Sequence, residues 1–326
     1  MIELNANVPD HFLVLERKET FGDYARKYGE ALAEHYENRG VIVVPFMPIT
    51  FDLALFQSIA FPMEWKKIGT ENGIEESVFV REGTNLTDRE DHLFRRLDMG
   101  TQWASYLQSQ VASFNWQLRG GLHVLFPSYH SLQDVNITWR LTETREEGMH
   151  LDYFDGGAPT MPGAKLAHRL KIFINIDSEP RRWRTSFDLP GVLDKCRQQL
   201  PTEMPDDLNV VNNVIDKVGA LKNLPFHNLA YPTMSAVICN GEALAHEVIY
   251  GQRTVGAEFM CYQHDMLDPK KHTHHCIRQW LEQSGYHRCR RGRGGKAVRA
   301  DEGQLRAHPG SAAETVGKGQ LVRAGM

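Results

Sequence analysis

The sequence predicts an α+β fold in which N-terminal helices precede a β-rich core of the jelly-roll kind. Helical spacing of apolar residues dominates the front of the chain, short turn-bounded strands dominate the second half, and the two do not alternate as βαβ units. With 326 residues the chain has the length of about two average domains, or of one enlarged domain. We expect a single domain over residues 1–286, helical to about residue 125, with its jelly-roll core over about 126–265.

The helical part contains two segments with a clear helical pattern. Aromatic and aliphatic side chains at three- and four-residue intervals predict helices over residues 20–39 and 101–125. Gly40 ends the first of these. The β-branched run 41–46 that follows predicts a short buried strand, so the chain opens with a helix leading into a strand.

The second half reads as a series of short strands. β-Branched and aromatic residues recur in runs of five to nine, separated by Gly, Pro and polar turn residues. Such a series without regular βαβ alternation is typical of an antiparallel sandwich or barrel. The predicted strands cover residues 134–141, 169–176, 235–239, 243–250 and 254–262.

Composition excludes several classes of protein. Apolar residues make up 41% and charged residues 24%, which is ordinary for a globular protein. No apolar run reaches the roughly 18 residues of a transmembrane helix, and no basic and apolar leader is present, so we expect a cytoplasmic protein. Five cysteines without a Cys-x-x-Cys pair favour reduced thiols over disulfides.

The last forty residues differ from the rest. Residues 287–326 hold nine Lys or Arg against three acids, a charge of +6 that leaves about −10 on the rest of the chain. This Gly- and Arg-rich segment lacks Phe, Trp and Tyr, so we expect a disordered tail. Such a basic tail could make peripheral contact with an anionic membrane. A nucleic-acid partner is not expected, because no aromatic residues are present for base stacking and the rest of the chain is acidic.

The best candidate for a chemical site is a set of metal ligands. His150 and Asp152 stand two residues apart, so on a strand their side chains share one face. His246, in an apolar predicted strand, could supply a third ligand. Two histidines and one carboxylate with open positions form the facial triad typical of non-haem Fe(II) oxygenases. A second such pair, His35 and Glu37, falls on a predicted helix, where its side chains diverge.

Two alternatives to this site remain open. His246 could be a buried structural histidine. A zinc cluster could instead be built from a group of Cys and His residues near the end of the β-rich region, although the spacing matches no zinc template. That group comprises Cys261, His264, His272, His274, His275 and Cys276.

Three segments, in this order, resemble the Kdo hydroxylase family: 170–176, 180–184, and Ala245-His246 followed by Gly251-Gln252. Members of that family are Fe(II)- and 2-oxoglutarate-dependent dioxygenases. They hydroxylate 3-deoxy-manno-octulosonic acid (Kdo), an acidic sugar of lipopolysaccharide. The resemblance extends loosely over residues 40–285 and implies a double-stranded β-helix, or cupin-like, core.

The resemblance also implies roles for individual residues. The family's iron ligands correspond to His150, Asp152 and His246, and its Trp-Arg segment to Trp183 and Arg184. The expected cofactors are Fe(II), 2-oxoglutarate as co-substrate, and O₂. The expected substrate is a small or lipid-linked acidic molecule, most simply a Kdo-type sugar acid.

The far carboxylate of 2-oxoglutarate needs a buried cation, and several residues could provide it. If Gly251-Gln252 is a hairpin turn, Ala257 faces His246 and Arg253 shares that face four residues away. Lys171 is the rival, on one strand face with Asn175, which we include in the same pocket. Arg140 is a further candidate.

Arg181, Trp183 and Arg184 follow a proline, so we expect them on a loop over the barrel mouth. Guanidinium groups suit carboxylates and a Trp suits a sugar face, which predicts substrate binding. A surface loop with a tucked Trp is the alternative for these residues. For the whole protein, the alternatives are a 2-oxoglutarate oxygenase acting on an amino acid or a natural-product scaffold, and a non-catalytic jelly-roll module that binds acidic glycans.

Overall fold

A computed structural model places helices and strands in residues 1–60, 68–71, 101–141, 143–145, 148–154, 167–200 and 208–285, and these are the residues described below. The chain divides into a unit of residues 1–288 and a second of residues 289–326. The predicted tail, 287–326, lies outside the described residues. Among the described helices, none combines the length and apolar character needed to cross a bilayer.

The larger sheet has seven strands in the order β2-β3-β10-β7-β12-β5-β4. Every neighbouring pair is antiparallel except β2 and β3. Apolar β-branched residues at its centre form a sheet that is buried on both faces. Its strands are β2 (Phe12–Val14), β3 (Val41–Val44), β4 (Ile68–Glu71), β5 (Gln133–Arg140), β7 (Ala167–Asn175), β10 (Ala236–Cys239) and β12 (Thr254–Tyr262).

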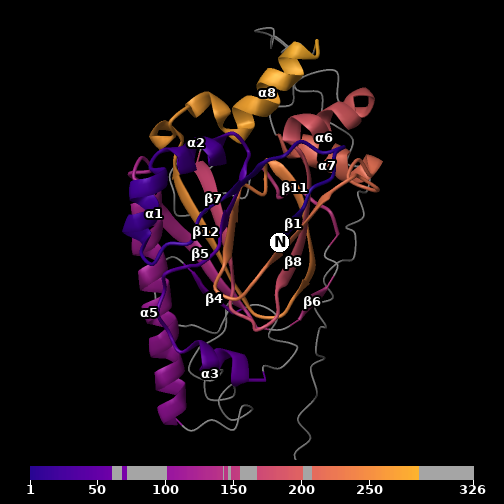
Figure 1. Cartoon of the computed structure of the whole chain (residues 1–326). Helices are drawn as coiled ribbons and strands as arrows, with labels where there is room; N and C mark the ends of the chain where they lie inside the picture. Colours follow the sequence, from indigo (N-terminus) through magenta and orange to yellow (C-terminus); the bar gives the residue numbers. More distant parts are fainter. Residues whose placement is uncertain are drawn as a thin grey trace, which may run out of the picture. The chain divides into compact units, whose positions relative to one another are not determined.

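The smaller sheet has five strands in the order β1-β9-β8-β11-β6, all antiparallel. The inner faces of the two sheets pack together, because Val237 of the larger sheet shares a core cluster with Trp183 and Leu229 of the smaller. From β5 onward the chain passes repeatedly from one sheet to the other (Figure 1). The strands are β1 (Ile2–Glu3), β6 (Thr144–Arg145), β8 (Arg181–Asp188), β9 (His227–Tyr231) and β11 (Leu244–Gly251).

Helices cover the outer face of the larger sheet. The long helix α5 (Thr101–Leu125) buries an apolar stripe against this sheet, beside α1 (Phe21–Tyr28) and α2 (Ala31–Glu37) (Figure 1). The single helix predicted over residues 20–39 is in fact two. Gly29, at φ +50°, adopts a backbone conformation that favours glycine and separates α1 from α2.

A second group of helices packs on the smaller sheet near one end of the strands (Figure 1). These helices join Leu151, Phe154 and Ala245 in one apolar cluster, and they lie on the side of β11 opposite the larger sheet. The remaining helix, α3 (Leu53–Ser58), lies near the lower end of α5. The second group comprises α6 (Leu189–Lys195), α7 (Asn209–Val218) and α8 (Thr273–Gln283).

The predicted α+β class and all five predicted strands of the second half are present. Two expectations were wrong. Residues 181–184 lie in strand β8 rather than on a loop. The strands on either side of Gly251-Gln252 are not a hairpin pair, because β11 belongs to the smaller sheet and β12 to the larger; Ala257 accordingly pairs with Ile172 and Ile137 and not with His246.

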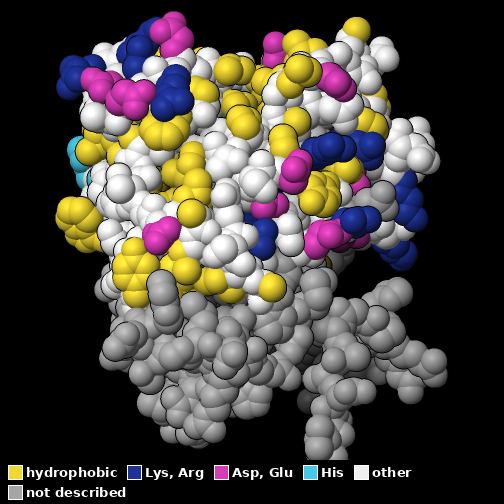
Figure 2. Space-filling model, turned by 60° about the horizontal axis from the view of Figure 1, so that its bottom comes forward, with side chains coloured by type: hydrophobic (Ala, Val, Ile, Leu, Met, Phe, Trp, Pro, Cys, Tyr) yellow, Lys and Arg dark blue, Asp and Glu magenta, His cyan; other side chains and the backbone are white. Residues whose placement is uncertain are grey.

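One surface of the described part is drawn in Figure 2. Lys and Arg side chains are intermingled there with Asp and Glu, and apolar side chains lie between them. The described residues on that face therefore form no extended patch of a single charge.

Candidate metal centre

The two histidines and the aspartate of the predicted facial triad converge. One ligand atom from each of His150, Asp152 and His246 lies within 4.8 Å of the others. Within the described ranges, no other group of at least three His, Cys, Asp or Glu residues meets the same criterion. The convergence was predictable from the spacing of His150 and Asp152, but the position of His246 depends on the fold.

Backbone hydrogen bonds hold the three ligands in place. The N–H of His150 donates to the carbonyl of His246 and the N–H of His246 donates back, both at 3.0 Å, so the two residues form a β-bridge at the edge of β11. The N–H of Asp152 donates to the carbonyl of Gly241 at 2.8 Å. Both ends of the His-x-Asp segment are thereby fixed to the β10–β11 region.

Each imidazole is oriented by a second hydrogen bond. The Nδ1 of His150 lies 2.8 Å from the Gly148 carbonyl, and the Nδ1 of His246 lies 3.0 Å from the Leu244 carbonyl. A carbonyl oxygen only accepts, so each Nδ1 carries the proton and each Nε2 keeps its lone pair. A hydrogen bond from the non-ligating ring nitrogen to a carbonyl is typical of metal-bound histidines.

The space around the ligands fits a small ion. A Cβ atom at Gly241 would overlap the Asp152 carboxylate and would come within 2.9 Å of the His246 ring, so only glycine fits there. On the other side, Trp183 stacks on the His246 ring with a centroid separation of 5.6 Å and an angle of 24°. The residues present therefore suit a bound divalent cation with nitrogen and oxygen ligands.

Electrostatics prepare the ligands to bind a cation. Burial opposes ionisation of Asp152, but the Lys171 ammonium at 2.7 Å and the neighbouring His246 outweigh it and hold the pKa of the carboxyl well below its usual range. Burial lowers the pKa of His246 to about 4. At neutral pH the site thus presents an ionised carboxylate and a neutral imidazole.

A chain of buried charges continues from Asp152 into the barrel. Lys171 lies 3.9 Å from Glu258, which contacts the buried Arg169 at 2.7 Å, and Arg169 contacts the buried Glu242 at 3.3 Å. Burial raises the pKa of Glu242 to about 7 against the opposing effect of Arg169. Alternating signs offset part of the cost of burying these groups.

The residues considered as partners for the 2-oxoglutarate carboxylate make different contacts in the structure. Arg253 donates to the buried Asp177, just after β7, and to the Ile59 carbonyl, at the end of α3, both at 3.1 Å. Its guanidinium is therefore already used in contacts that hold these two segments. Asn175 donates to the carbonyls of Glu179 and Tyr231 and accepts from the Asp177 N–H, so its side chain bonds to the backbone of the turn and of β9. Lys171 lies directly against a candidate metal ligand.

Arg181 is a better candidate for that carboxylate than the sequence indicated. It shares the inner face of β8 with Trp183 and Thr185, and Thr185 pairs with His246, so Arg181 stands roughly 13 Å along the strand from the metal ligands. It is 1% exposed. Burial raises the pKa of Tyr231, and both Arg181 and Arg140 partly offset the rise, so two guanidiniums lie near one buried hydroxyl.

Trp183 and Arg184 occupy opposite faces of β8. Trp183 is 1% exposed and packs between Phe173 and the His246 ring inside the barrel. Arg184 points the other way, where it contacts Glu247 at 3.6 Å. The expectation that both lie over the barrel mouth was therefore wrong, because a strand sends consecutive side chains to opposite faces.

The alternative zinc cluster does not assemble among the residues that the structure describes. His272 caps the first turn of α8, which carries Ile277, Trp280 and Leu281. The His272 ring contacts the Ala167 carbonyl, and the His274 ring contacts the Phe154 carbonyl. These histidines thus serve in packing and capping.

No protein-family model and no curated protein sequence matches the chain. Solved structures do. The Kdo hydroxylase KdoO, a non-heme Fe(II) α-ketoglutarate-dependent dioxygenase solved with cobalt(II), matches at 18% identity with a TM-score of 0.63, covering 84% of this chain and 96% of that chain. The same enzyme with α-ketoglutarate and Fe(III) matches over 83% and 96%, and with succinate and Fe(III) over 88% and 100%, both at 18% identity and a TM-score of 0.63.

The chain has the fold of a Kdo hydroxylase. The predicted resemblance to that family is thereby confirmed at the level of fold. The likeness covers nearly all of the KdoO chain.

Proposed function

We propose that this protein is an Fe(II)- and 2-oxoglutarate-dependent dioxygenase that hydroxylates a small acidic substrate, most simply a Kdo-type sugar acid. The observation that carries the proposal is the convergence of His150, Asp152 and His246, with both Nδ1 atoms bonded to carbonyls and both Nε2 atoms available. The alternation of successive strands between two facing sheets supports a double-stranded β-helix, or jelly-roll, core. The match with KdoO supports the same conclusion.

When bound, Fe(II) and 2-oxoglutarate supply oxidative decarboxylation coupled to hydroxylation. The two imidazoles and the carboxylate would hold the metal and would leave coordination positions for the co-substrate and O₂. Lys171 keeps the Asp152 carboxylate ionised and directed. Trp183 fills the wall beside His246 and keeps water away from that ligand.

Arg181, with Tyr231 and Arg140, is the proposed anchor for the far carboxylate of 2-oxoglutarate. A guanidinium can bind a carboxylate with two parallel hydrogen bonds, and a tyrosine hydroxyl can add a third. Gly256 pairs with Phe173, between the level of Arg181 and that of the metal ligands. Having no side chain, Gly256 leaves space in the barrel that a larger residue would fill. This reassigns Arg181 from substrate to co-substrate binding.

The proposal also covers the rest of the chain. Residues 1–286 form one oxygenase domain, and a cytoplasmic protein of this kind could meet a lipid-linked acidic sugar with the help of the basic segment 287–326. That segment carries nine Lys or Arg against three acids, which suits contact with an anionic surface.

The decisive experiment measures succinate formed from 2-oxoglutarate under O₂ with added Fe(II), with and without Kdo. We expect iron-dependent turnover in the wild type and its loss in His150→Ala and Asp152→Ala. His264→Ala, which alters an exposed histidine outside the site, is the control and should behave as the wild type.

Absence of turnover in the wild type, together with no Fe(II)–2-oxoglutarate absorption band under anaerobic conditions, would contradict the proposal. A non-catalytic glycan-binding module would then be the remaining interpretation. Turnover that survives in Asp152→Ala would contradict the assigned ligand set instead.

A further inference from the structure

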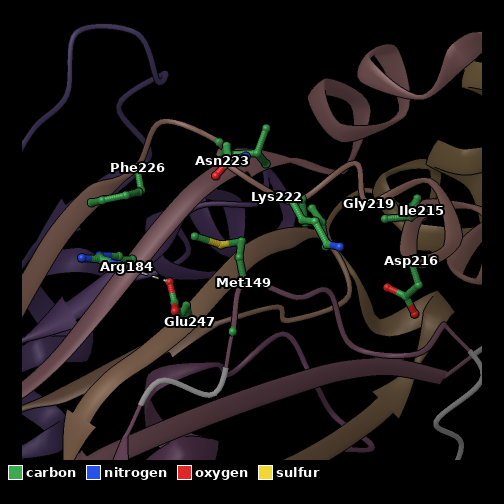
Figure 3. A pocket seen from close by; sticks show the side chains of 12 residues that line it. Met149, Arg184, Ile215, Asp216, Gly219, Lys222, Asn223, Phe226 and Glu247 are labelled. Atoms are coloured by element: carbon green, nitrogen blue, oxygen red, sulfur yellow. Dashed lines mark ion pairs between the residues drawn. The ribbon is translucent and has the colours of Figure 1, made fainter. Parts of the chain in front are cut away.

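A second hollow lies behind the metal centre, on the outer face of the smaller sheet. Its volume is about 550 Å³, within the range of small-molecule sites. The walls come from β8, β11, the segment before His150, and the end of α7 with the turn that follows it (Figure 3). Glu247 and Arg184, a cross-strand pair, point into it, whereas their neighbours His246 and Trp183 point into the barrel.

The charged groups of this pocket are of both signs. Arg184 lies over the Phe226 ring at 4.1 Å and contacts Glu247 at 3.6 Å, which is long enough to leave guanidinium donors for a ligand. Lys222 and Asp216 stand on the opposite wall, and both are exposed (Figure 3). A ligand here meets two cations and two carboxylates within one cavity.

The apolar groups lie between these charges. In Figure 3 the Met149 side chain extends between Arg184 and Lys222, and Phe226 borders the same side as Arg184. Apolar side chains beside carboxylates, a guanidinium and an ammonium suit a sugar ring, whose C–H face packs on the apolar wall while its hydroxyls donate to the carboxylates.

We infer that this pocket binds a small carboxylated sugar at a site separate from the metal centre. Arg184 binds the ligand's carboxylate, and Lys222 on the opposite wall donates to its hydroxyls, from which Asp216 and Glu247 accept hydrogen bonds. A phosphate without hydroxyl donors would supply no hydrogen bonds to the two carboxylates. A purely apolar ligand would desolvate the charged groups without supplying hydrogen bonds to any of them.

The site is connected with the metal centre through the chain itself. Met149 precedes His150 and Glu247 follows His246, and the two histidines are bridged by backbone hydrogen bonds. Binding in the pocket can be measured without iron, so this inference does not depend on the proposed enzyme activity.

The test uses the full chain, freed of metal by a chelator, with ¹³C-methyl-labelled methionine. The Met149 signal, assigned from Met149→Leu, is followed by NMR as D-glucuronate is added, and D-glucose serves as the neutral probe with the same ring. We expect a saturable shift of the Met149 signal with glucuronate and none with glucose. Kdo, tested in parallel, should produce the same kind of shift.

Variants locate the binding. Arg184→Gln should weaken glucuronate binding by roughly tenfold or more, since it removes a charged hydrogen-bond donor. Lys222→Ala should weaken it as well, and this exposed position gives a second variant that does not disturb packing. Lys217→Ala, also exposed on α7 but outside the pocket, is the matched control and should bind as the wild type.

Three results would overturn the inference: no saturable shift of Met149, an equal response to glucose, or binding that is lost in Asp152→Ala and retained in both Arg184→Gln and Lys222→Ala. The last result would assign the sugar to the metal centre.

Discussion

The two faces of the β8–β11 layer differ although they are made by neighbouring residues. Towards the barrel, Trp183 and His246 are almost completely buried and form one stacked unit. Towards the outside, Arg184 and Glu247 keep 34% and 13% of their side chains exposed and line an open pocket. The inner face holds the side chain of a candidate metal ligand in a fixed position, and the outer face has charged side chains that a molecule from solution can contact.

This contrast follows from the geometry of a strand. Side chains alternate at every residue, so a short run such as 181–184 contributes to two environments that the layer itself separates. Residues 181–184 therefore cannot share one functional role, because alternate residues face different environments. Each residue has to be placed on its face before its chemistry is interpreted.

The largest difference between the faces should appear in stability. Trp183→Ala leaves a cavity in the barrel wall and should lower the free energy of unfolding by about 3–5 kcal/mol. Arg184→Ala should cost no more than about 1 kcal/mol, because its ion pair and ring contact are partly solvated. Urea unfolding of the two variants measures both. Equal losses would show that the two faces are packed alike.

The pH dependence of stability should report on the charges enclosed by the barrel. Glu242 has a pKa raised to about 7 from 4.5, so the folded protein holds its proton more tightly than the unfolded chain. Its contribution to stability is complete below about pH 4.5 and is lost as the pH rises towards 7, by up to about 3 kcal/mol.

Glu242→Gln removes this dependence. The free energy of unfolding of the variant, relative to the wild type, should therefore increase between pH 5 and pH 8. Histidines with lowered pKa values, such as His168 and His272, cancel in this difference because both proteins contain them. Unfolding curves that stay parallel over this range would contradict a raised pKa for Glu242.

A glycine beside the ligands should matter more for metal binding than for folding. Gly241→Ala places a methyl group against the Asp152 carboxylate and should weaken Fe(II) or Co(II) binding by about a hundredfold, because the carboxylate is pushed from its position. Gly120→Ala is the control, since a methyl group there meets no atom within 4 Å. Metal titration followed by the Co(II) absorption spectrum measures both. Unchanged affinity in Gly241→Ala would show that the cradle can relax.

Much of this fold could be predicted from the sequence, because periodicity is local. Helix α5 and the strands β7, β10, β11 and β12 follow from apolar spacing within each segment. Strand β8 was missed because its run Arg-Arg-Trp-Arg-Thr-Ser-Phe-Asp carries too many charges to read as a strand. The alternating side chains of β8 can be interpreted only when both faces of the smaller sheet are known to be covered by other parts of the protein.

The site divides in the same way. His150 and Asp152 are two residues apart, so their convergence is a local property. His246 was a candidate from its apolar predicted strand, and the resemblance assigned it as the third ligand. The cation for the co-substrate could not be predicted, because the pairing of β8 with β9 and β11 decides which arginine enters the barrel. The alternation of Arg181, Trp183 and Thr185 at every second residue indicates one strand face. It was not used because a loop was expected for this segment.

The smallest expected effect compares Arg181 with Arg253, of which only Arg253 was a candidate for the co-substrate carboxylate from the sequence. Arg181→Gln should raise the KM for 2-oxoglutarate by roughly tenfold or more, since a buried charged hydrogen bond to the carboxylate is weakened. Arg253→Gln should leave this KM unchanged and act on stability alone, because the Arg253 guanidinium is bonded to Asp177 and to the Ile59 carbonyl. Succinate formation at a series of 2-oxoglutarate concentrations measures both constants. If Arg253→Gln raised the KM and Arg181→Gln did not, the co-substrate would extend towards the turn, and the inner face of β8 would lose its assigned role.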